Sequence, residues 1–446
     1  MGAPTILIKH AIVMPSDPRP DYFIPDGAVV LAEGAIAAVG PTDEVLGRYP
    51  QNDVVIDGSR SIVMPGLISA HTHITGDFLR GLTEDIENHF YGFALPLEDY
   101  LTDEISYRID ALGAVECLKY GITCINDIYH YSDAMARAVS EAGLRGVIAH
   151  KVFDVNLRNL ERDDYTRDAG QGEEKLRTNL KLIDDWHGKA DGRITCRIGT
   201  HATDTCSPEL LRTAKAEALK RGVGVHIHVA QSDREAAYVK RAYGKTSVGF
   251  LDGLGFFDED VLAAHLILAD DDDLEIIRRR GTAVGHCPVI YGKVGAYPDL
   301  RLMLSKGIPV GLGVDWLSMD IWENMRQAIA INRILARGER TMDAATVFHL
   351  ATMGSARALR MDRSIGSLTP GKKADVTIVD RRGAHMAPLR NPLQNAVYYA
   401  NGGDVRTVIV DGRVVVEDGE VKTVDEERVV DEAQRAAEQV WSNIKT

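Results

Sequence analysis

Short apolar runs alternate with amphipathic patterns through the middle of the chain. Eight of these runs have the length and the Val and Ile content of strands that are buried on both faces. They are Ile62–His73, Ile122–Ile128, Arg145–Phe153, Ile194–His201, Val223–Ala230, Val261–Ile267, Thr282–Cys287 and Pro309–Asp315. Helical spacing of apolar residues lies between them, for example at Glu104–Lys119, Ser207–Arg221, Asp272–Arg280 and Asn324–Leu335. Eight strands that alternate with helices predict a closed parallel (β/α)8 TIM barrel.

Both ends of the chain consist instead of short strands and tight turns. The strand-like segments are Thr5–Val13, Ala28–Val39, Val54–Asp57, Ala374–Asp380, Thr407–Asp411 and Val414–Val416. Turns are predicted at Glu33-Gly34, Asp411-Gly412 and Asp418-Gly419. We expect one small β-sandwich made from residues 1–62 and 363–446, with an amphipathic helix at Glu426–Ile444, and the barrel at residues 63–362.

Six of the eight predicted strands end in or near a histidine or an aspartate. These residues are His71, His73, His201, His228, His265, His286 and Asp315. The C-terminal ends of the strands form the active site of such a barrel, so we expect these side chains to meet at one rim. His71 and His73 are two residues apart on a strand, and both imidazoles therefore leave the same face. A ligand set of several imidazoles and one carboxylate suits Zn²⁺, and Fe²⁺ or Mn²⁺ are compatible with the same ligands.

Three further features near these strands have structural interpretations. His226 also precedes the strand end at His228, and we interpret it as a packing residue. Gly311 and Gly313 lie just before Asp315, where they would let the backbone approach the site closely. The acidic run Asp270–Asp273 precedes a helix and is interpreted as a cap.

Aromatic residues are concentrated in the segment Gly76–Leu101, which follows the first predicted strand. They are Phe78, Phe90, Tyr91, Phe93 and Tyr100. Together with Tyr291 and Trp316 they are suited to wall an aromatic substrate by stacking. The alternative is that most of them pack helices together, and the sequence favours neither interpretation.

Composition narrows the classes of partner. The chain has 446 residues, a net charge of −14 and a pI near 5.5, which argues against a nucleic-acid or anionic-membrane partner because such partners need clustered Lys and Arg. Its five cysteines form no C-x-x-C pair, which favours a reducing cytoplasmic location. Residues 1–15 lack the pattern of a signal peptide, and no apolar stretch approaches the ~20 residues of a membrane span.

Several motifs resemble the amidohydrolase superfamily. Pro65–His73, with the sequence PGLISAHTH, is similar to its opening signature, and Gly366–Asp375, with the sequence GSLTPGKKAD, is similar to its return into the flanking sandwich. Intermediate pieces agree, namely Arg80-Gly81-Leu82, His201 before Thr205-Cys206-Ser207-Pro208-Glu209, and His286-Cys287-Pro288. The resemblance covers essentially the whole chain. It is closest to the branch of adenosine-type, guanine and triazine aminohydrolases and chlorohydrolases.

This resemblance implies one metal ion and a set of residue roles. The metal ligands would be His71, His73, His228, His265 and Asp315, and Asp315 would also accept a proton from the attacking water. His286 would polarise the substrate or position the nucleophile, and His201 would contact the substrate. We add Tyr291, Trp316 and Phe90 as expected substrate contacts. A homo-oligomer is also implied by the resemblance alone.

One position departs from the family pattern. The family has H-x-x-E on its fifth strand, where the glutamate moves a proton to a ring nitrogen or a leaving group, whereas this chain has His228-Val229-Ala230-Gln231. A glutamine cannot act as a Brønsted acid, and loss of such a group typically costs on the order of 10²–10⁴ in rate. We therefore expect either another proton source (Asp315, His286 or His201) or a leaving group that needs no proton, with Gln231 as a catalytic-site residue. Ile290-Tyr291 also replaces the usual Ser-Asn after His-Cys-Pro.

The leading hypothesis is a hydrolase that deaminates an N-heterocycle of the purine, pterin, pyrimidine or triazine type, with one divalent ion, most simply zinc. One alternative is hydrolysis of a carbon–chlorine or other C–X bond on a triazine-like ring. The other is a non-catalytic protein that binds a metal or ligand, since the glutamate is absent.

Overall fold

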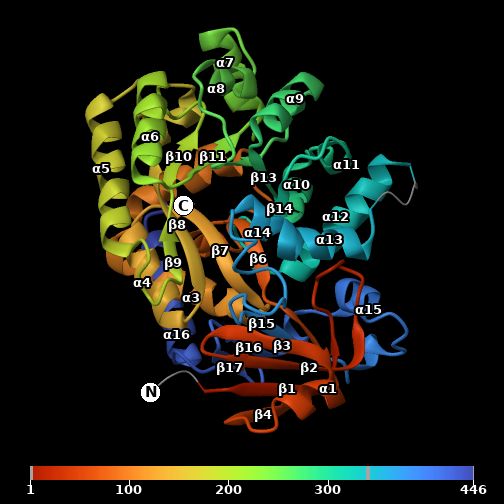
Figure 1. Cartoon of the computed structure of the whole chain (residues 1–446). Coiled ribbons are helices and arrows are strands. Elements are labelled where there is room, and N and C mark those ends of the chain that lie inside the picture. The colour runs from red at the N-terminus through yellow and green to blue at the C-terminus, as the bar shows by residue number, and fades with distance from the viewer. Residues whose placement is uncertain (1–3, 338–341, 445–446) are drawn as a thin grey trace.

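The computed structural model describes residues 4–337 and 342–444. The outermost residues of the predicted terminal module lie outside these ranges. Figure 1 shows a barrel with helices around it and a separate sheet beneath it, in which strands from the start of the chain (red) and from its end (blue) lie together.

Eight parallel strand positions make the barrel, as the sequence predicted. The hydrogen-bonded order is β14-β13-β12-β11-β10-β8-β7-β6, with β9 beside β8. The strands are β6 (Leu67–Thr72), β7 (Ile122–Tyr129), β8 (Arg145–Val152), β9 (Ile194–Cys196), β10 (Ile198–Ala202), β11 (Val225–Val229), β12 (Val261–His265), β13 (Ala283–His286) and β14 (Val310–Leu312).

The first and last barrel strands, β6 and β14, meet at their C-terminal ends and close the barrel. Thr72 and Asp315 form a parallel bridge. The amide of His73 donates to the carbonyl of Asp315 at 2.8 Å, and the amide of Asp315 donates to the carbonyl of His71 at 3.0 Å. Three candidate metal ligands, His71, His73 and Asp315, therefore form the seam of the barrel together with Thr72.

Two predicted strands are each broken into two elements. Ile62–His73 divides at Gly66 into β5 (Ser61–Pro65), which belongs to the terminal sheet, and β6 of the barrel. A side chain at Gly66 would overlap Thr123, so only glycine lets the chain pass between the two sheets at this point. Ile194–His201 divides at Arg197 into β9 and β10.

The terminal module is one connected sheet built from both ends of the chain. Its order is β18-β17-β16-β15-β5-β1-β2-β3, and β4 also pairs with β1. The turns predicted at Glu33-Gly34, Asp411-Gly412 and Asp418-Gly419 are present, with positive φ at all six residues. The strands are β1 (Ile6–Val13), β2 (Ile24–Ala32), β3 (Ala35–Pro41), β4 (Val54–Asp57), β5, β15 (Val376–Asp380), β16 (Val405–Val410), β17 (Arg413–Glu417) and β18 (Glu420–Val421).

The helices surround the barrel strands, and one of them, α9, begins at the cap that the sequence predicted. Asp270 and Asp273 form a capping box at the start of α9, as expected for the acidic run. The helices of the barrel are α2 (Leu95–Leu97), α3 (Asp103–Lys119), α4 (Ser132–Ala142), α5 (Ala169–Trp186), α6 (Pro208–Arg221), α7 (Asp233–Tyr243), α8 (Ser247–Gly253), α9 (Asp271–Arg280), α10 (Pro288–Val294), α11 (Leu300–Ser305), α12 (Ile321–Leu335), α13 (Ala344–His349) and α14 (Ser355–Ala358).

Shorter helical turns and three outer helices complete the chain. The turns are η1 (Ile74–Leu79), η2 (His89–Ala94), η3 (Glu98–Tyr100), η4 (Leu157–Arg162), η5 (Leu350–Gly354), η6 (Ala384–Met386) and η7 (Gly402–Asp404). The outer helices are α1 (Thr42–Arg48), α15 (Pro392–Tyr399) and α16 (Glu426–Trp441). The last of these is the predicted C-terminal helix, and it packs against α3.

A buried ion pair joins the barrel to the terminal sheet. Arg145, at the start of β8, donates from Nε and Nη2 to the two carboxylate oxygens of Asp375 at 2.8 and 2.9 Å. Asp375 also accepts the amide of Asp411 at 2.8 Å. Both charged side chains are 3% exposed, so this pair fixes how the two parts of the molecule pack.

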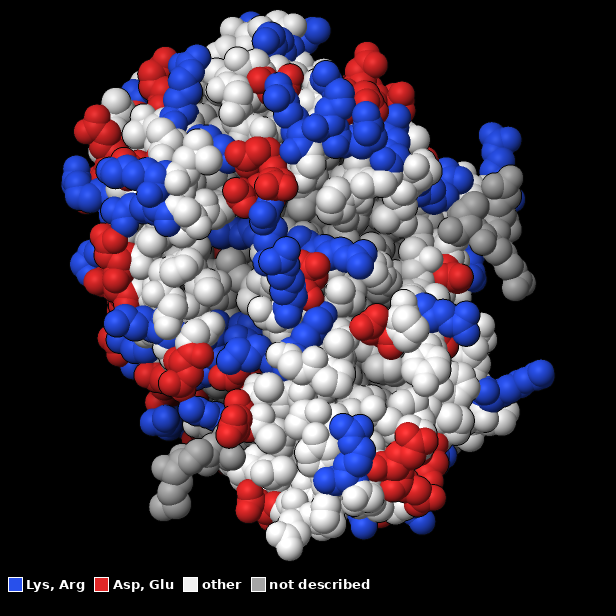
Figure 2. Space-filling model, in the orientation of Figure 1, with Lys and Arg blue, Asp and Glu red and all other residues white. Residues whose placement is uncertain are grey.

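The surface carries charges of both signs. Acidic and basic side chains are interspersed over the face shown in Figure 2. Among the described residues, none of the helices combines the length and apolar character that a bilayer crossing needs.

Candidate active site

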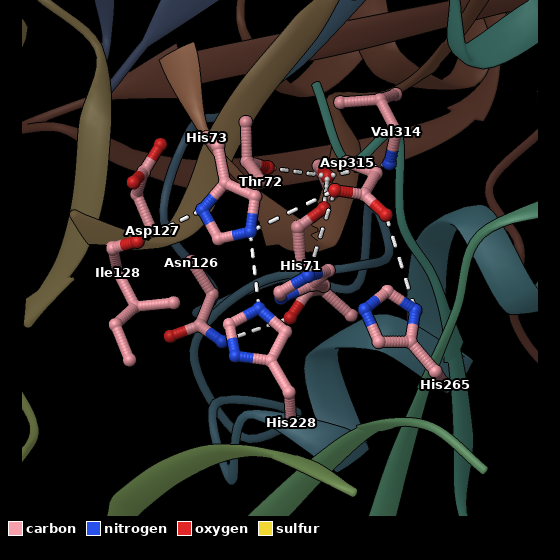
Figure 3. Close-up of polar contacts among 12 residues, drawn as sticks. His71, Thr72, His73, Asn126, Asp127, Ile128, His228, His265, Val314 and Asp315 are labelled. Carbon is pink, nitrogen blue, oxygen red and sulfur yellow. Dashed lines mark hydrogen bonds and ion pairs between the residues drawn. The ribbon is translucent and has the colours of Figure 1, made fainter. Parts of the chain in front are cut away.

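The predicted ligands meet at one end of the barrel. His71 lies on β6 and His73 directly follows that strand, His228 lies on β11, His265 ends β12, and Asp315 follows β14. All five are nearly or completely buried, and Figure 3 shows their side chains gathered around one point.

The distances between these side chains suit one cation. Nε2 of His73 lies 3.1 Å from Nε2 of His228. One Asp315 oxygen lies 3.8 Å from Nε2 of His71 and 3.7 Å from Nε2 of His73. The other oxygen lies 3.9 Å from Nδ1 of His265. Cys287 is close to the same atoms, within 4.8 Å of His71, His265 and Asp315.

Hydrogen bonds behind the rings leave their inward nitrogens unprotonated. Nδ1 of His73 donates to the carbonyl of Ile128 at 2.8 Å, and Nδ1 of His228 donates to the carbonyl of His201 at 2.5 Å. A carbonyl can only accept, so in each neutral ring the proton is on Nδ1 and the lone pair is on Nε2. Two lone pairs that face each other at 3.1 Å repel unless a cation lies between them.

Burial keeps these imidazoles neutral. It lowers the pKa of His71, His73 and His265 well below the usual value, and it lowers the pKa of His228 to about 4. Burial raises the pKa of Asp315 to about 8. Nearby positive charge favours the ionised form of a carboxyl, so a cation at this point would stabilise the Asp315 carboxylate.

Two buried nitrogens have no hydrogen-bond partner, and this is the strongest sign that the site holds an ion. Nε2 of His71 and Nδ1 of His265 are both buried and unpaired, a costly state for polar atoms in a protein interior. Four imidazoles and a carboxylate are the ligand chemistry of a divalent transition-metal ion. The residues therefore fit one metal ion.

The backbone at the strand ends is unusual. His265 and Asp315 have φ values of 80° and 65°, and Ala230, Leu266 and Leu317 are also left-handed. Non-glycine residues in this region are held there by the surrounding structure, and they cluster at functional sites. A side chain at Gly313 would collide with Cys287 and with the backbone of His71, which confirms the close approach expected of this glycine.

A cavity of about 460 Å³ opens at the site and is lined by four of the five candidate ligands, His73, His228, His265 and Asp315. His201, Tyr291, Trp316, Phe90 and Gln231, all predicted at the site, line it. Tyr91 lines it as well, whereas Phe78, Phe93 and Tyr100 belong to or pack against the hydrophobic core. The aromatic segment therefore divides between the two alternatives that the sequence left open.

His286 ends β13 as expected but does not line the cavity. Its Nε2 lies 2.8 Å from the hydroxyl of Tyr297, which also accepts from Asn332 at 2.9 Å. Tyr291 packs edge-on against the His286 ring. Any contact of His286 with a substrate would need this arrangement to change.

The sequence reasoning missed an ion pair in the cavity wall. Glu98 begins η3, and Lys151 lies on β8. Nζ of Lys151 lies 2.9 and 2.7 Å from the two oxygens of Glu98. Tyr129 donates to Glu98 at 2.8 Å, and Nε2 of His130 lies 2.8 Å from it. A lysine inside an apolar strand pattern was the available signal, because lysine is rarely buried unless it is paired.

Gln231 lies at the cavity with its backbone fixed by a neighbour. Its amide and that of Ala230 donate to the two oxygens of Glu235, both at 2.8 Å. Glu235 is completely buried and does not line the cavity. It therefore shapes the turn after β11 and does not replace the missing cavity glutamate.

Comparisons of sequence give a consistent set of relatives. Residues 62–415 match the profile of the Amidohydrolase family. A 5′-deoxyadenosine deaminase of Methanosarcina mazei is 36% identical, over 99% of this chain and 99% of the relative. A 5-methylthioadenosine/S-adenosylhomocysteine deaminase of Pelotomaculum thermopropionicum is 34% identical, over 97% and 98% of the two chains.

Solved structures share the fold. An adenosine deaminase from Xanthomonas campestris with bound zinc superposes with a TM-score of 0.90 at 24% identity, covering 98% of both chains. An atrazine chlorohydrolase from Arthrobacter aurescens complexed with zinc gives a TM-score of 0.84 at 21% identity, covering 97% of this chain and all of the other.

Proposed function

Because the chain belongs to the amidohydrolase family, as the motifs in its sequence indicated, we propose that it is a metal-dependent hydrolase that deaminates an N-heterocycle. The observation that carries this proposal is the convergence of four histidines and Asp315 at the floor of a cavity with aromatic walls. A protein that binds no metal would have no need for unpaired, buried imidazole nitrogens next to a cavity.

The bound ion would activate water as a nucleophile near neutral pH. Asp315 is placed to take the proton that this water loses, because its carboxylate lies within 4 Å of three of the ligand imidazoles. His201 reaches the cavity from β10 with Nδ1 held 2.9 Å from the hydroxyl of Thr205, so Nε2 is left for the substrate. Trp316 and Phe90 form a wall against which a flat ring can stack.

We further propose an adenosine-type nucleoside as the substrate. The two relatives described above are named for 5′-substituted adenosines, and a cavity of about 460 Å³ lies within the range of small-molecule sites. Wild-type protein loaded with zinc should release ammonia from 5′-deoxyadenosine and give the corresponding inosine. Release of ammonia from none of a panel of aminopurine, aminopterin, aminopyrimidine and aminotriazine compounds would refute deamination.

Gln231 supports a second candidate, which is hydrolysis of a C–X bond. A chloride leaves without a proton, so the absence of an acid at position 231 would cost such a reaction little. The same panel with chlorine in place of the amino group distinguishes the two, because release of halide without ammonia selects this second activity. A protein that binds metal and turns over neither panel would be the non-catalytic homologue.

Several finer assignments are also proposals. Zinc is the ion that we propose, with iron as the alternative, and the structural relatives with bound zinc support it. A homo-oligomer is proposed from the family alone. The five cysteines are buried free thiols, which supports a cytoplasmic location. We also propose that residues 63–362 form the catalytic domain and that residues 1–62 and 363–446 form the terminal β domain.

A further inference from the structure

Deamination needs a proton at the leaving amino group, and Gln231 has none to give. An amine is expelled as ammonia only after its nitrogen is protonated. His286, one of the expected donors, lies off the cavity with its Nε2 at the Tyr297 hydroxyl. Nδ1 of His201 lies 2.9 Å from the hydroxyl of Thr205, which itself donates to the carbonyl of Ala202, so the proton of the neutral ring is on Nδ1 and Nε2 has none to give. Asp315, the remaining expected donor, acts in this reaction as the base toward the attacking water, so the amine needs a separate acid.

Lys151 has the required placement and a proton. Its side chain is 4% exposed and lines the same cavity as His73, His228 and Asp315. Nζ lies 5.1 Å from the centre of the Tyr129 ring, and that ring lies 5.6 Å from the ring of His73. Two of the three ammonium protons are directed at Glu98, which leaves a third for another partner.

A hydrogen-bonded path leads from Lys151 out of the catalytic cavity. Glu98 lines this cavity and also a second cavity of about 800 Å³ on its other side. Nε2 of His130, which faces the second cavity, lies 2.8 Å from the Glu98 carboxylate. Exposed residues such as Asp99, Asp133 and Asp185 line the second cavity, so it reaches the surface. Lys151, Glu98 and His130 thus connect the reaction site to solvent away from the cavity mouth.

We propose that Lys151 is the catalytic acid that protonates the leaving amino group, and that Glu98 and His130 return a proton to it from the second cavity. The inference rests on the proposed deaminase function. Asp315 takes one proton from the attacking water as the new C–O bond forms. The ammonium of Lys151 gives a proton to the amino nitrogen, the C–N bond breaks, and ammonia leaves. After product release Asp315 loses its proton to solvent and Lys151 regains one, so water and amine are converted to alcohol and ammonia without any other reactant.

The charges around Lys151 are consistent with a usable acid. The titratable groups that face it are Glu98 from η3, Tyr129 from β7, His130 just after β7, Lys175 from α5, His201 from β10, His228 from β11 and His73 just after β6. Burial lowers the pKa of Lys151 even though Glu98 opposes this effect. An ammonium with a lowered pKa gives up its proton more readily than a solvated one.

The test replaces the acid and keeps its charge. Lys151→Arg retains a cation for Glu98 but cannot donate a proton at accessible pH. With 5′-deoxyadenosine as the probe, kcat for ammonia release should fall by roughly 10²–10⁴-fold. With the chloropurine analogue that carries the same sugar, kcat for chloride release should change by less than about tenfold, because chloride needs no proton. The alkaline limb of the pH–rate profile should also disappear for the amine.

A rescue experiment distinguishes proton donation from a structural effect. When Gln231→Glu is introduced into the Lys151→Arg variant, kcat for ammonia release should rise at least about tenfold, because the glutamate supplies an acid at the family position. Lys215→Met is the matched control, since Lys215 is another buried lysine in an ion pair, at 2.6 Å from Asp258 and remote from both cavities. It should leave the ratio of the two rates unchanged.

Three results would overturn the proposal. These are equal loss of both reactions in Lys151→Arg, unchanged deamination in that variant, and no rescue by Gln231→Glu. If Lys151→Arg does not fold, the Lys151→Met/Glu98→Gln double variant removes both charges and is judged by the same ratio. Wild-type protein that binds zinc but deaminates nothing would instead refute the proposed function. Failure of the deaminase proposal is therefore distinguished from failure of the role proposed for Lys151.

Discussion

Nδ1 of His71 lies 2.8 Å from Nε2 of His226, two residues before the proposed ligand His228 on β11. If Nε2 of His71 binds the ion, as we propose, the ring carries its proton on Nδ1 and donates it to His226, which fixes the ring. His226 is thus a positioning residue as well as a buried one, and its packing interpretation was incomplete. We predict that His226→Leu lowers metal affinity by roughly 10–100-fold.

Competition with a chromophoric chelator measures that affinity. His349→Leu is the control, since His349 is a partly buried histidine on α13 that does not line either cavity. An affinity equal to that of the wild type in His226→Leu would show that the hydrogen bond does not hold His71.

Removal of the ion should destabilise the protein as well as inactivate it. A ligand that binds only the folded state at about 100 times its Kd adds about 3 kcal/mol of stability. We therefore expect dialysis against a chelator to lower Tm and abolish turnover, and zinc to restore both. Asp315→Asn should remove most of the shift in Tm that zinc produces. A Tm that does not respond to zinc would contradict a metal site at Asp315.

Trp316 should contribute to substrate binding more than to the chemical step. Its ring packs edge-on with Phe90, with centroids 6.2 Å apart, and both line the cavity. Loss of a stacking surface worth about 1 kcal/mol predicts that Trp316→Ala raises KM about fivefold with a smaller change in kcat. Trp186→Ala, on α5 and outside both cavities, serves as the control. A fall in kcat with unchanged KM would oppose a stacking role.

The burial of His286 predicts that the protein loses stability in acid. Burial lowers its pKa to about 3 in the folded protein, from 6.5 for the exposed group. At pH values between these two pKa values, the histidine is protonated in the unfolded chain but neutral in the folded protein. The free energy of unfolding therefore falls as pH drops below about 6.5. This one group costs about 2 kcal/mol by about pH 5.

His286→Gln keeps a donor toward Tyr297 and should remove that part of the pH dependence, as measured by urea unfolding of the chelator-treated protein near pH 7 and near pH 5. A His286→Gln variant that loses as much stability between these two pH values as the wild type would show that burial of His286 is not the cause.

The Arg145–Asp375 pair should matter for stability far from the catalytic cavity. Loss of one partner of a buried ion pair typically costs about 3–5 kcal/mol, because the other charge stays buried alone. Arg145→Met should therefore lower the free energy of unfolding by about that amount. Glu275→Gln, in an exposed pair with Arg278, should change it by less than about 1 kcal/mol. Equal effects of the two substitutions would refute this prediction.

Much of the fold and the meeting of the candidate ligands at one rim could be predicted because their signals are local. Buried parallel strands are recognised by apolar runs, turns by Asp-Gly and Glu-Gly pairs, and the ligands by histidines at strand ends. Gly66 shows the limit of this reasoning. The run Ile62–His73 is continuous in sequence, and only the proximity of Thr123 and Asp375 reveals that it passes from one sheet to another.

The residues behind the ligands could not be predicted, since their roles depend on distant parts of the chain. His226 meets His71 across 155 positions, and Lys151 meets Glu98 across 53. Neither pair has a spacing that marks it in sequence. The position of His286 outside the cavity could not be predicted for the same reason, because its partner Tyr297 lies in an irregular segment after α10.

The seam between His71, His73 and Asp315 makes assembly of the enzyme all-or-none. Strands from positions some 240 residues apart must both be in place before the ligand set exists. During synthesis a nascent chain that ends before Asp315 has no complete site for an ion and no closed barrel, so it cannot hydrolyse anything. Metal binding would then require a completely folded barrel. Bound metal would in turn stabilise the contact between the first and last strands of the barrel.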